Sequence, residues 1–289
     1  MTAQSSEPVE SSEPVEQARP FSAATVLAEQ GDGRFTAELG RLFTIGDKAH
    51  GGLLMVLLAK AGLARLDAAR PGEEPLDPVA VSTEFLRAPE LGVVELSADV
   101  VKTGRQVSVA AVRMTQGGRV MLTATVTGGR LPDEEPAWHV PTAMAAEPPQ
   151  DAIATVPGLR VPGEGLAAAT EARFDRATAA FLRGETAEPV MRGWMRPRGE
   201  DPDPLFALLA GDALPPTVFN LGAGFGWAPT VQLSALLRGR PAPGWLRCES
   251  RCVLVAGTWF DEDCTVTDAT GRVICQARQL ALAPQRART

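Results

Sequence analysis

Apolar and polar positions change their period twice along the chain, in the same order each time. Residues 53–66 are apolar apart from Lys60 and Arg65, which is typical of a helix buried on all sides. Its start is glycine-rich, which allows close backbone approach. A meander of strands after one buried helix predicts an antiparallel sheet wrapped around that helix. The expected strands cover residues 79–87, 93–103, 106–115 and 120–127, and a further strand pair is expected within residues 21–45.

The same order returns in the second half of the chain. Asp201-Pro202-Asp203-Pro204 is a start signal for a helix at residues 205–214, which Pro215-Pro216 would end. Segments 171–183 and 190–196 precede this helix. Strands are then expected at residues 229–238, 245–257, 258–267 and 272–282. The pattern predicts an α+β protein that contains two copies of one helix-plus-sheet unit.

Composition shifts divide the chain into segments. Residues 5–10 and 11–16 repeat Ser-Ser-Glu-Pro-Val-Glu, a composition that cannot build a core, so residues 1–20 are expected to be a disordered tail. A stretch rich in proline predicts a surface linker. The expected layout is therefore a first unit at 21–130, the linker at 131–165 and a second unit at 166–285.

Charge and composition exclude several classes of protein. A net charge of -7 over 289 residues argues against a nucleic-acid partner, which would need a basic face. No apolar run of the sequence approaches the roughly 20 residues that span a bilayer. The first residues lack a secretory pattern, which favours a cytoplasmic protein with reduced cysteines. Cysteine and histidine spacings do not fit a zinc site, and no metal or cofactor is expected.

An overlay of the two halves shows a polar difference between them. Leu53–Lys60 falls on Leu205–Asp212, so Lys60 lies opposite Asp212. Val79 lies opposite Thr230, and Val126 lies opposite Gln279. Only the second half carries groups that suit the handling of a water molecule.

The expected faces of these elements agree with a site in the second half. Asp212 lies on the apolar stripe of its predicted helix, and Gln279 shares the inward face of its strand with Cys275 and Ala277. Thr230 shares its strand face with Gln232 and Ser234, which leaves its direction open. Each residue alone also fits a structural role, with Asp212 exposed at a helix end. Their joint occurrence at equivalent positions favours a site.

Several short motifs then point to a known family. They are His50-Gly51-Gly52, Phe85-Leu86-Arg87-Ala88-Pro89, Thr103-Gly104-Arg105, Gly211-Asp212-Ala213-Leu214-Pro215, Pro229-Thr230 and Arg278-Gln279-Leu280. The set resembles the acyl-CoA thioesterase II group of tandem (double) hot-dog proteins, in which a sheet wraps a central helix. The resemblance runs from Phe21 to about Pro284.

The resemblance implies a role for each candidate residue. In that family an Asp, a Thr and a Gln of the second hot-dog activate the water that attacks an acyl-CoA thioester, and Asp212, Thr230 and Gln279 match them. The better-known members have Glu-Gly after this Gln, whereas this chain has Leu280-Ala281, which puts the substrate range in question.

Elementary chemistry is compatible with these roles. Burial would raise the pKa of an Asp on an apolar stripe, as suits a general base. Backbone N–H groups of Gly51 and Gly52 would polarise the thioester carbonyl at the positive end of the helix. His50 fits a site residue and a helix-capping residue equally well.

Other classes of function use the same scaffold. A non-catalytic acyl-CoA or lipid-binding protein is one alternative, and a hot-dog hydratase or dehydratase is another. The latter needs a catalytic His, for which His50 and His139 are poorly placed. A serine hydrolase is disfavoured because the sequence has no Gly-x-Ser-x-Gly motif. Exposed sheet edges favour a homo-oligomer.

Overall fold

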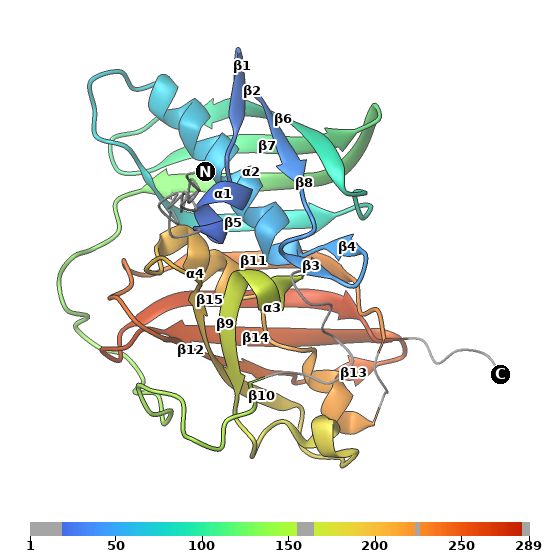
Figure 1. Ribbon diagram of the computed structural model, residues 1–289. Coiled ribbons are helices and arrows are strands. Elements are labelled where there is room, and N and C mark those ends of the chain that lie inside the picture. Colours follow the sequence, from blue (N-terminus) through green and yellow to red (C-terminus); the bar gives the residue numbers. More distant parts are fainter. Residues whose placement is uncertain (1–18, 155–164, 223–225, 285–289) are drawn as a thin grey trace, which may run out of the picture.

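One antiparallel sheet runs through both halves of the protein in the computed structural model, which describes residues 19–154, 165–222 and 226–284 (Figure 1). Its strand order is β1-β2-β6-β7-β8-β5-β11-β15-β14-β12-β10-β9, and β13 pairs with β14. The first-half strands therefore occupy one side of the sheet and the second-half strands occupy the other. Strands β5 and β11 join the halves, with Val81 opposite Ala235 and Thr83 opposite Leu233.

The first half is built around one long helix, as the sequence predicts. Helix α2 (Gly51–Ala68) is buried over most of its length and lies across the strands of this half (Figure 1). A short helix α1 and a strand pair precede it. The elements are α1 (Pro20–Ala24), β1 (Ala28–Gly31), β2 (Arg34–Leu39), β3 (Thr44–Ile45), β4 (Lys48–Ala49), α2, β5 (Asp77–Phe85), β6 (Gly92–Lys102), β7 (Ser108–Gln116) and β8 (Arg119–Gly129).

The second half repeats this plan with a much shorter central helix. Asp203 caps α4 by accepting a hydrogen bond from the Phe206 N–H. The elements are α3 (Leu166–Ala169), β9 (Thr170–Phe174), η1 (Ala180–Arg183), β10 (Val190–Pro197), α4 (Pro204–Ala210), η2 (Thr217–Leu221), β11 (Thr230–Leu237), β12 (Leu246–Arg251), β13 (Val255–Ala256), β14 (Trp259–Thr267) and β15 (Val273–Leu282).

Some predicted boundaries are wrong. The helix expected at 205–214 ends at Ala210, and a turn with i→i−3 hydrogen bonds from Asp212 and Ala213 follows it. Glycine fits at 211 because a β-carbon there would lie 2.9 Å from Cβ of Ala277 on β15. The segment 171–183 divides into β9 and η1, and the segment 245–257 divides into β12 and β13. The described part of the linker, 131–154, contains no helix or strand.

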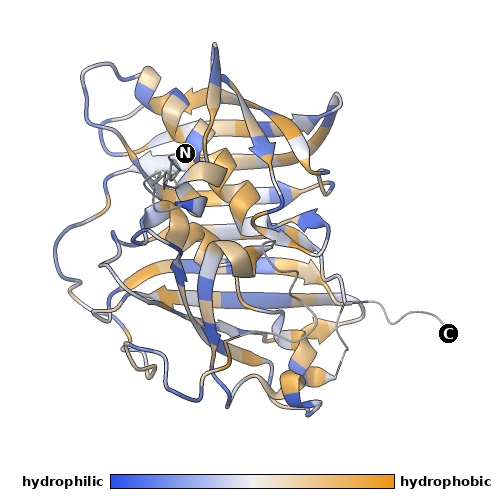
Figure 2. Cartoon of the chain, viewed as in Figure 1, coloured by the Kyte–Doolittle hydropathy of each residue, from blue (hydrophilic) through white to orange (hydrophobic). Residues whose placement is uncertain are grey.

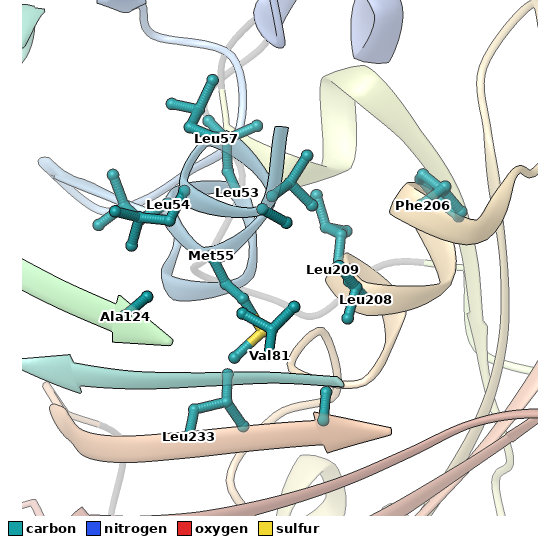
Figure 3. Close-up of a cluster of buried hydrophobic side chains, with 14 of the residues drawn as sticks. Leu53, Leu54, Met55, Leu57, Val81, Ala124, Phe206, Leu208, Leu209 and Leu233 are labelled. Carbon is teal, nitrogen blue, oxygen red and sulfur yellow. The ribbon is translucent and has the colours of Figure 1, made fainter. Parts of the chain in front are cut away.

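The two central helices share one core. Apolar residues are concentrated along α2 and α4, whereas the strands alternate (Figure 2). Figure 3 shows Met55 of α2 reaching towards Val81 and Leu233 on the two strands that join the halves. Tight packing at this junction fixes the start of α2 against the end of α4.

The structure leaves the predicted division into units and the predicted tail untested, and it describes only part of the predicted linker. The division into units at 21–130 and 166–285 remains a prediction, since both halves share a sheet. Residues 1–18 of the expected tail and residues 155–164 of the linker lie outside the described residues. Within the described ranges, every helix is too short or too polar to cross a bilayer.

Candidate active site

A cavity of about 1010 Å³ lies where the two halves meet. Its wall includes five of the six predicted site residues: His50 and Gly51 from the first half, and Asp212, Thr230 and Gln279 from the second. The sixth, Gly52, contacts Asp212 through its backbone. Residues that are far apart in sequence are thus brought to one place.

Asp212 lies in the turn that follows α4, and this turn lies against the N-terminus of α2. Its carboxylate accepts a hydrogen bond from the backbone N–H of Gly52. A β-carbon on Gly52 would lie 3.0 Å from the Leu209 backbone, so glycine permits this approach. Burial raises the pKa of Asp212 to about 7, and the hydrogen bond from Gly52 opposes this rise. A carboxyl with such a pKa can exchange a proton near neutral pH.

His50 holds the backbone of Asp212 in place. Its Nε2 atom lies 3.1 Å from the carbonyl oxygen of Asp212, and its side chain makes no capping hydrogen bond with α2. Burial lowers the pKa of His50 to about 4. A neutral imidazole therefore donates from Nε2, and the 3.9 Å separation between Nε2 and Asp212 Oδ2 is not an ion pair near neutral pH.

Thr230 and Gln279 form a hydrogen-bonded pair. The Thr230 hydroxyl donates to Oε1 of Gln279 at 2.8 Å. Gln279 points inward, as predicted, whereas its strand neighbours Arg278 and Leu280 are exposed.

A β-bulge determines the direction of Thr230. The register of β11 shifts between Thr230 and Gln232, which pair with Ala281 and Leu280 of β15. The shift places Thr230 on the cavity side, while Gln232 bonds to Ser82 and Ser234 on the opposite face. The simple alternation that grouped Thr230 with Gln232 is therefore wrong, because a bulge reverses the facing of the residues beyond it.

Glu262 is a fourth polar group in the cavity, and the sequence analysis missed it. It is 4% exposed and lies opposite Gln279 in the pairing of β14 with β15. Burial is the main cause that raises its pKa to about 7, and the charge of Asp212 adds to the rise. Its signal was available, because Phe260, Glu262 and Cys264 alternate on an inward face on which only Glu262 is charged.

The rest of the cavity wall is mixed in character. Aromatic and aliphatic side chains line one part, among them Phe174, Met195, Phe219, Phe260 and Leu282. Arg87 and Arg198 also belong to the wall. Such a cavity suits a ligand with an apolar portion and a charged portion. The described residues contain no cluster of His, Cys, Asp and Glu able to hold a metal ion.

Comparison with known families decides what kind of protein this is. Residues 39–129 match the family described as acyl-CoA thioesterase N-terminal domain, and residues 134–283 match the acyl-CoA thioesterase C-terminal domain. The chain belongs to the acyl-CoA thioesterase family. It is therefore a thioester hydrolase, as the motifs predicted.

Individual relatives match most of the chain. An uncharacterised protein of Mycobacterium tuberculosis is 42% identical in an alignment of 269 residues that covers 86% of this chain and 91% of that protein. The crystal structure of a candidate thioesterase II from Thermobifida fusca has a TM-score of 0.80 and 35% identity, covering 92% of this chain and 97% of that one.

A more distant structure supports the fold alone. A protein described as having a hot-dog fold, from Alicyclobacillus acidocaldarius, gives a TM-score of 0.78 at 22% identity, with coverage of 93% and 100%. The predicted tandem hot-dog architecture is confirmed.

Proposed function

We propose that this thioesterase hydrolyses acyl-CoA to a free fatty acid and CoA, with a water molecule activated by Asp212, Thr230 and Gln279. The observation that carries the proposal is the placement of a buried Asp212 carboxyl in the same cavity as the Thr230–Gln279 pair. A general base, a hydroxyl and an amide are thus assembled around one space without a metal ligand cluster in the described residues.

Asp212 acts as the general base. Its ionised carboxylate takes a proton from water as the water oxygen attacks the thioester carbonyl carbon. The tetrahedral intermediate then loses its C–S bond, and the thiolate of CoA leaves with the electron pair of that bond. The proton held by Asp212 returns to the thiolate, which restores the carboxylate for the next turnover.

Thr230 and Gln279 orient the attacking water. The amide of Gln279 has two N–H bonds, and the hydroxyl oxygen of Thr230 can accept a hydrogen bond while it donates to Gln279. Groups held in advance at such positions stabilise the charge that develops in the transition state. Gly51, at the positive end of α2, lies on the same wall and favours the negative charge on the thioester oxygen.

The direct test uses purified protein and a panel of acyl-CoA substrates of graded chain length, with released thiol measured. Asp212→Asn keeps the shape of the side chain and removes its basicity, so hydrolysis should fall by about 100-fold or more. Asp263→Asn is the matched control, because Asp263 lies on β14 with its side chain 48% exposed beside Arg278. Full turnover by folded Asp212→Asn overturns the proposed mechanism. Acyl-CoA that binds to the wild type without turnover favours the non-catalytic alternative.

Two further properties belong to the proposal. We expect the protein to work in the cytoplasm, which agrees with its four free, buried cysteines: Cys248, Cys252, Cys264 and Cys275. We also expect a homo-oligomer, since β1 and β9 leave open edges on the sheet.

A further inference from the structure

Glu262 is a buried carboxyl at the proposed site to which the proposed hydrolysis gives no part. It faces the cavity from β14, directly opposite Gln279 on β15. Its neighbours on the inward face of β14, Phe260 and Cys264, are buried and apolar. Burial of a charged group is costly, and an apolar residue of similar volume is often as stable or more stable. Core packing alone therefore gives no reason for a carboxyl here.

The hydrogen bonds of Glu262 fix the orientation of the Gln279 amide. Oε2 of Glu262 accepts from Nε2 of Gln279 at 2.6 Å, and Oε1 accepts from the backbone N–H of Thr217 at 2.5 Å. An ionised carboxylate can only accept hydrogen bonds. The amide nitrogen must therefore face Glu262, and the amide oxygen must face the Thr230 hydroxyl, which donates to it.

This arrangement leaves one amide N–H bond of Gln279 for the cavity. Glu262 takes the first N–H bond of Nε2, and Gln279 itself lines the cavity. If the amide turned over, its nitrogen would face the Thr230 hydroxyl and its oxygen would meet the Glu262 carboxylate, so acceptor would face acceptor. An amide side chain has no such preference of its own, because its two ends have nearly the same shape.

We propose that Glu262 is a positioning residue for hydrolysis, which holds the Gln279 amide in the orientation that directs an N–H bond towards the reacting water and thioester. The inference rests on the proposed function, since it requires Gln279 to take part in the reaction. Glu262 also bonds to Thr217, which follows Asp212 by a short loop. One carboxylate thus links the amide to the segment that carries the base.

The pKa of Glu262 sets the conditions for a test. Burial raises this pKa to about 7, while the hydrogen bonds from Thr217 and Gln279 favour the ionised form. At about pH 8.5 the carboxylate is mostly ionised. Assays at that pH therefore examine the acceptor-only state on which the positioning depends.

The experiment is a double-mutant cycle with Glu262→Gln and Gln279→Ala, measured by acyl-CoA hydrolysis. Glu262→Gln keeps the size of the side chain but presents a donor as readily as an acceptor. We expect kcat to fall by about 10- to 100-fold, while KM changes by less than about threefold, because a misplaced group lowers the rate more than binding. In the Gln279→Ala background, Glu262→Gln should lower kcat by less than about twofold, since residues that act through one another are not additive.

Further variants separate positioning from packing. Glu262→Met has similar volume and no acceptor. It leaves the buried N–H of Thr217 without its partner, so it should fold with a thermal midpoint several degrees below that of the wild type and show the same loss of kcat. Asp263→Asn, the neighbouring carboxyl on the opposite face of β14, should retain wild-type kcat and KM. Its side chain is half exposed and lies beside Arg278.

Two results would overturn the inference: a wild-type kcat in folded Glu262→Gln, or an equal loss from Glu262→Gln with and without Gln279. Both can occur while Asp212→Asn and Gln279→Ala still lower kcat strongly, so they leave the proposed function intact. Failure of the proposed function looks different, because Gln279→Ala or Asp212→Asn would then keep full turnover.

Discussion

Oδ2 of Asp212 lies 2.7 Å from the position that a β-carbon would take on Gly51. The first residue of α2 and the proposed base are therefore in direct contact across the junction of the two halves. Since Gly52 donates its N–H to the same carboxylate, the start of α2 determines where the base lies. The geometry of the proposed site therefore depends on two glycines that carry no reactive group.

Gly51→Ala should lower kcat without preventing folding. The new methyl group would displace the Asp212 carboxylate or tilt α2, and a displacement of about 1 Å can lower the rate by about 100-fold. Gly40→Ala is the matched control, because a β-carbon on Gly40 would meet no atom within 4 Å. Steady-state kinetics and thermal unfolding of both variants make the test. Unchanged kcat in Gly51→Ala would show that the base tolerates a shift.

The sequence predicts the plan of the fold because that plan follows from periodicity. The run at 53–66 is almost wholly apolar, which predicts a buried helix, and the strands after it alternate; these elements appear as α2 and β5 to β8. The helix end at Ala210 was not predictable in the same way. The turn after it packs Gly211 against Ala277 of β15, and these two residues are distant in sequence.

The site was predictable in part for the same reason. Asp212 and Gln279 stand out as polar groups among apolar neighbours, and both reach the cavity. The direction of the Thr230 side chain depends on the bulge at Val231, and the alternation of apolar and polar residues along the strand does not predict a bulge. A similar bulge in the first half also changes which residue there is equivalent to Thr230. Strand β5 shifts between Pro78 and Ala80, so the counterpart of Thr230 is Pro78 rather than Val79.

The pH dependence of hydrolysis should report the raised pKa of Asp212. The base works only when ionised, and its pKa of about 7 means that protonation removes activity as the pH falls through 7. We expect kcat/KM to decrease by at least about tenfold per pH unit below this value and to level off above it. His50 stays neutral over this range, because its pKa is lowered to about 4.

Glu262 should steepen this acidic limb. Its own pKa is also about 7, and two interacting carboxyls titrate as a pair. The wild type should therefore lose activity more steeply than one group allows, and Glu262→Gln should restore a slope of about one. Initial rates between about pH 5 and 9 measure this slope. A limb near the ordinary Asp pKa of about 4 would contradict the assignment of Asp212 as a buried base.

Thr230 should matter through its hydroxyl rather than its shape. Thr230→Val has nearly the same volume but cannot bond to Gln279, so kcat should fall by about 10- to 100-fold. Thr230→Ser keeps the hydroxyl and should retain most of the rate. Thr125→Val, on an exposed position of β8, is the control for a strand threonine. Equal activity of the Val and Ser variants at position 230 would remove the hydroxyl from the mechanism.

The first half should shape the protein without contributing a second base. Lys60, the counterpart of Asp212, donates to the carbonyl oxygen of Thr25. Burial lowers the pKa of Lys60, and the charge of Asp203, which caps α4, opposes this and favours the ammonium form. At the start of α2 the neighbouring group from the other half is the carboxylate of Asp212. At the start of α4 the equivalent group is the ammonium of Lys60, which lies near the capping carboxylate of Asp203. An ammonium group with these partners cannot take a proton from water.

A substitution at Val126 tests whether the first half takes no part in the reaction. It pairs with Val81 on β5, as Gln279 pairs with Leu233 on β11, so it occupies the place of the amide in the first half. Val126 is fully buried, and Val126→Ala should lower the free energy of unfolding by about 1–3 kcal/mol through the cavity it leaves. Its kcat should stay within about twofold of the wild type at temperatures below unfolding. Chemical denaturation and kinetics on one preparation separate the two effects. A large loss of kcat in stable Val126→Ala would place part of the reaction in the first half.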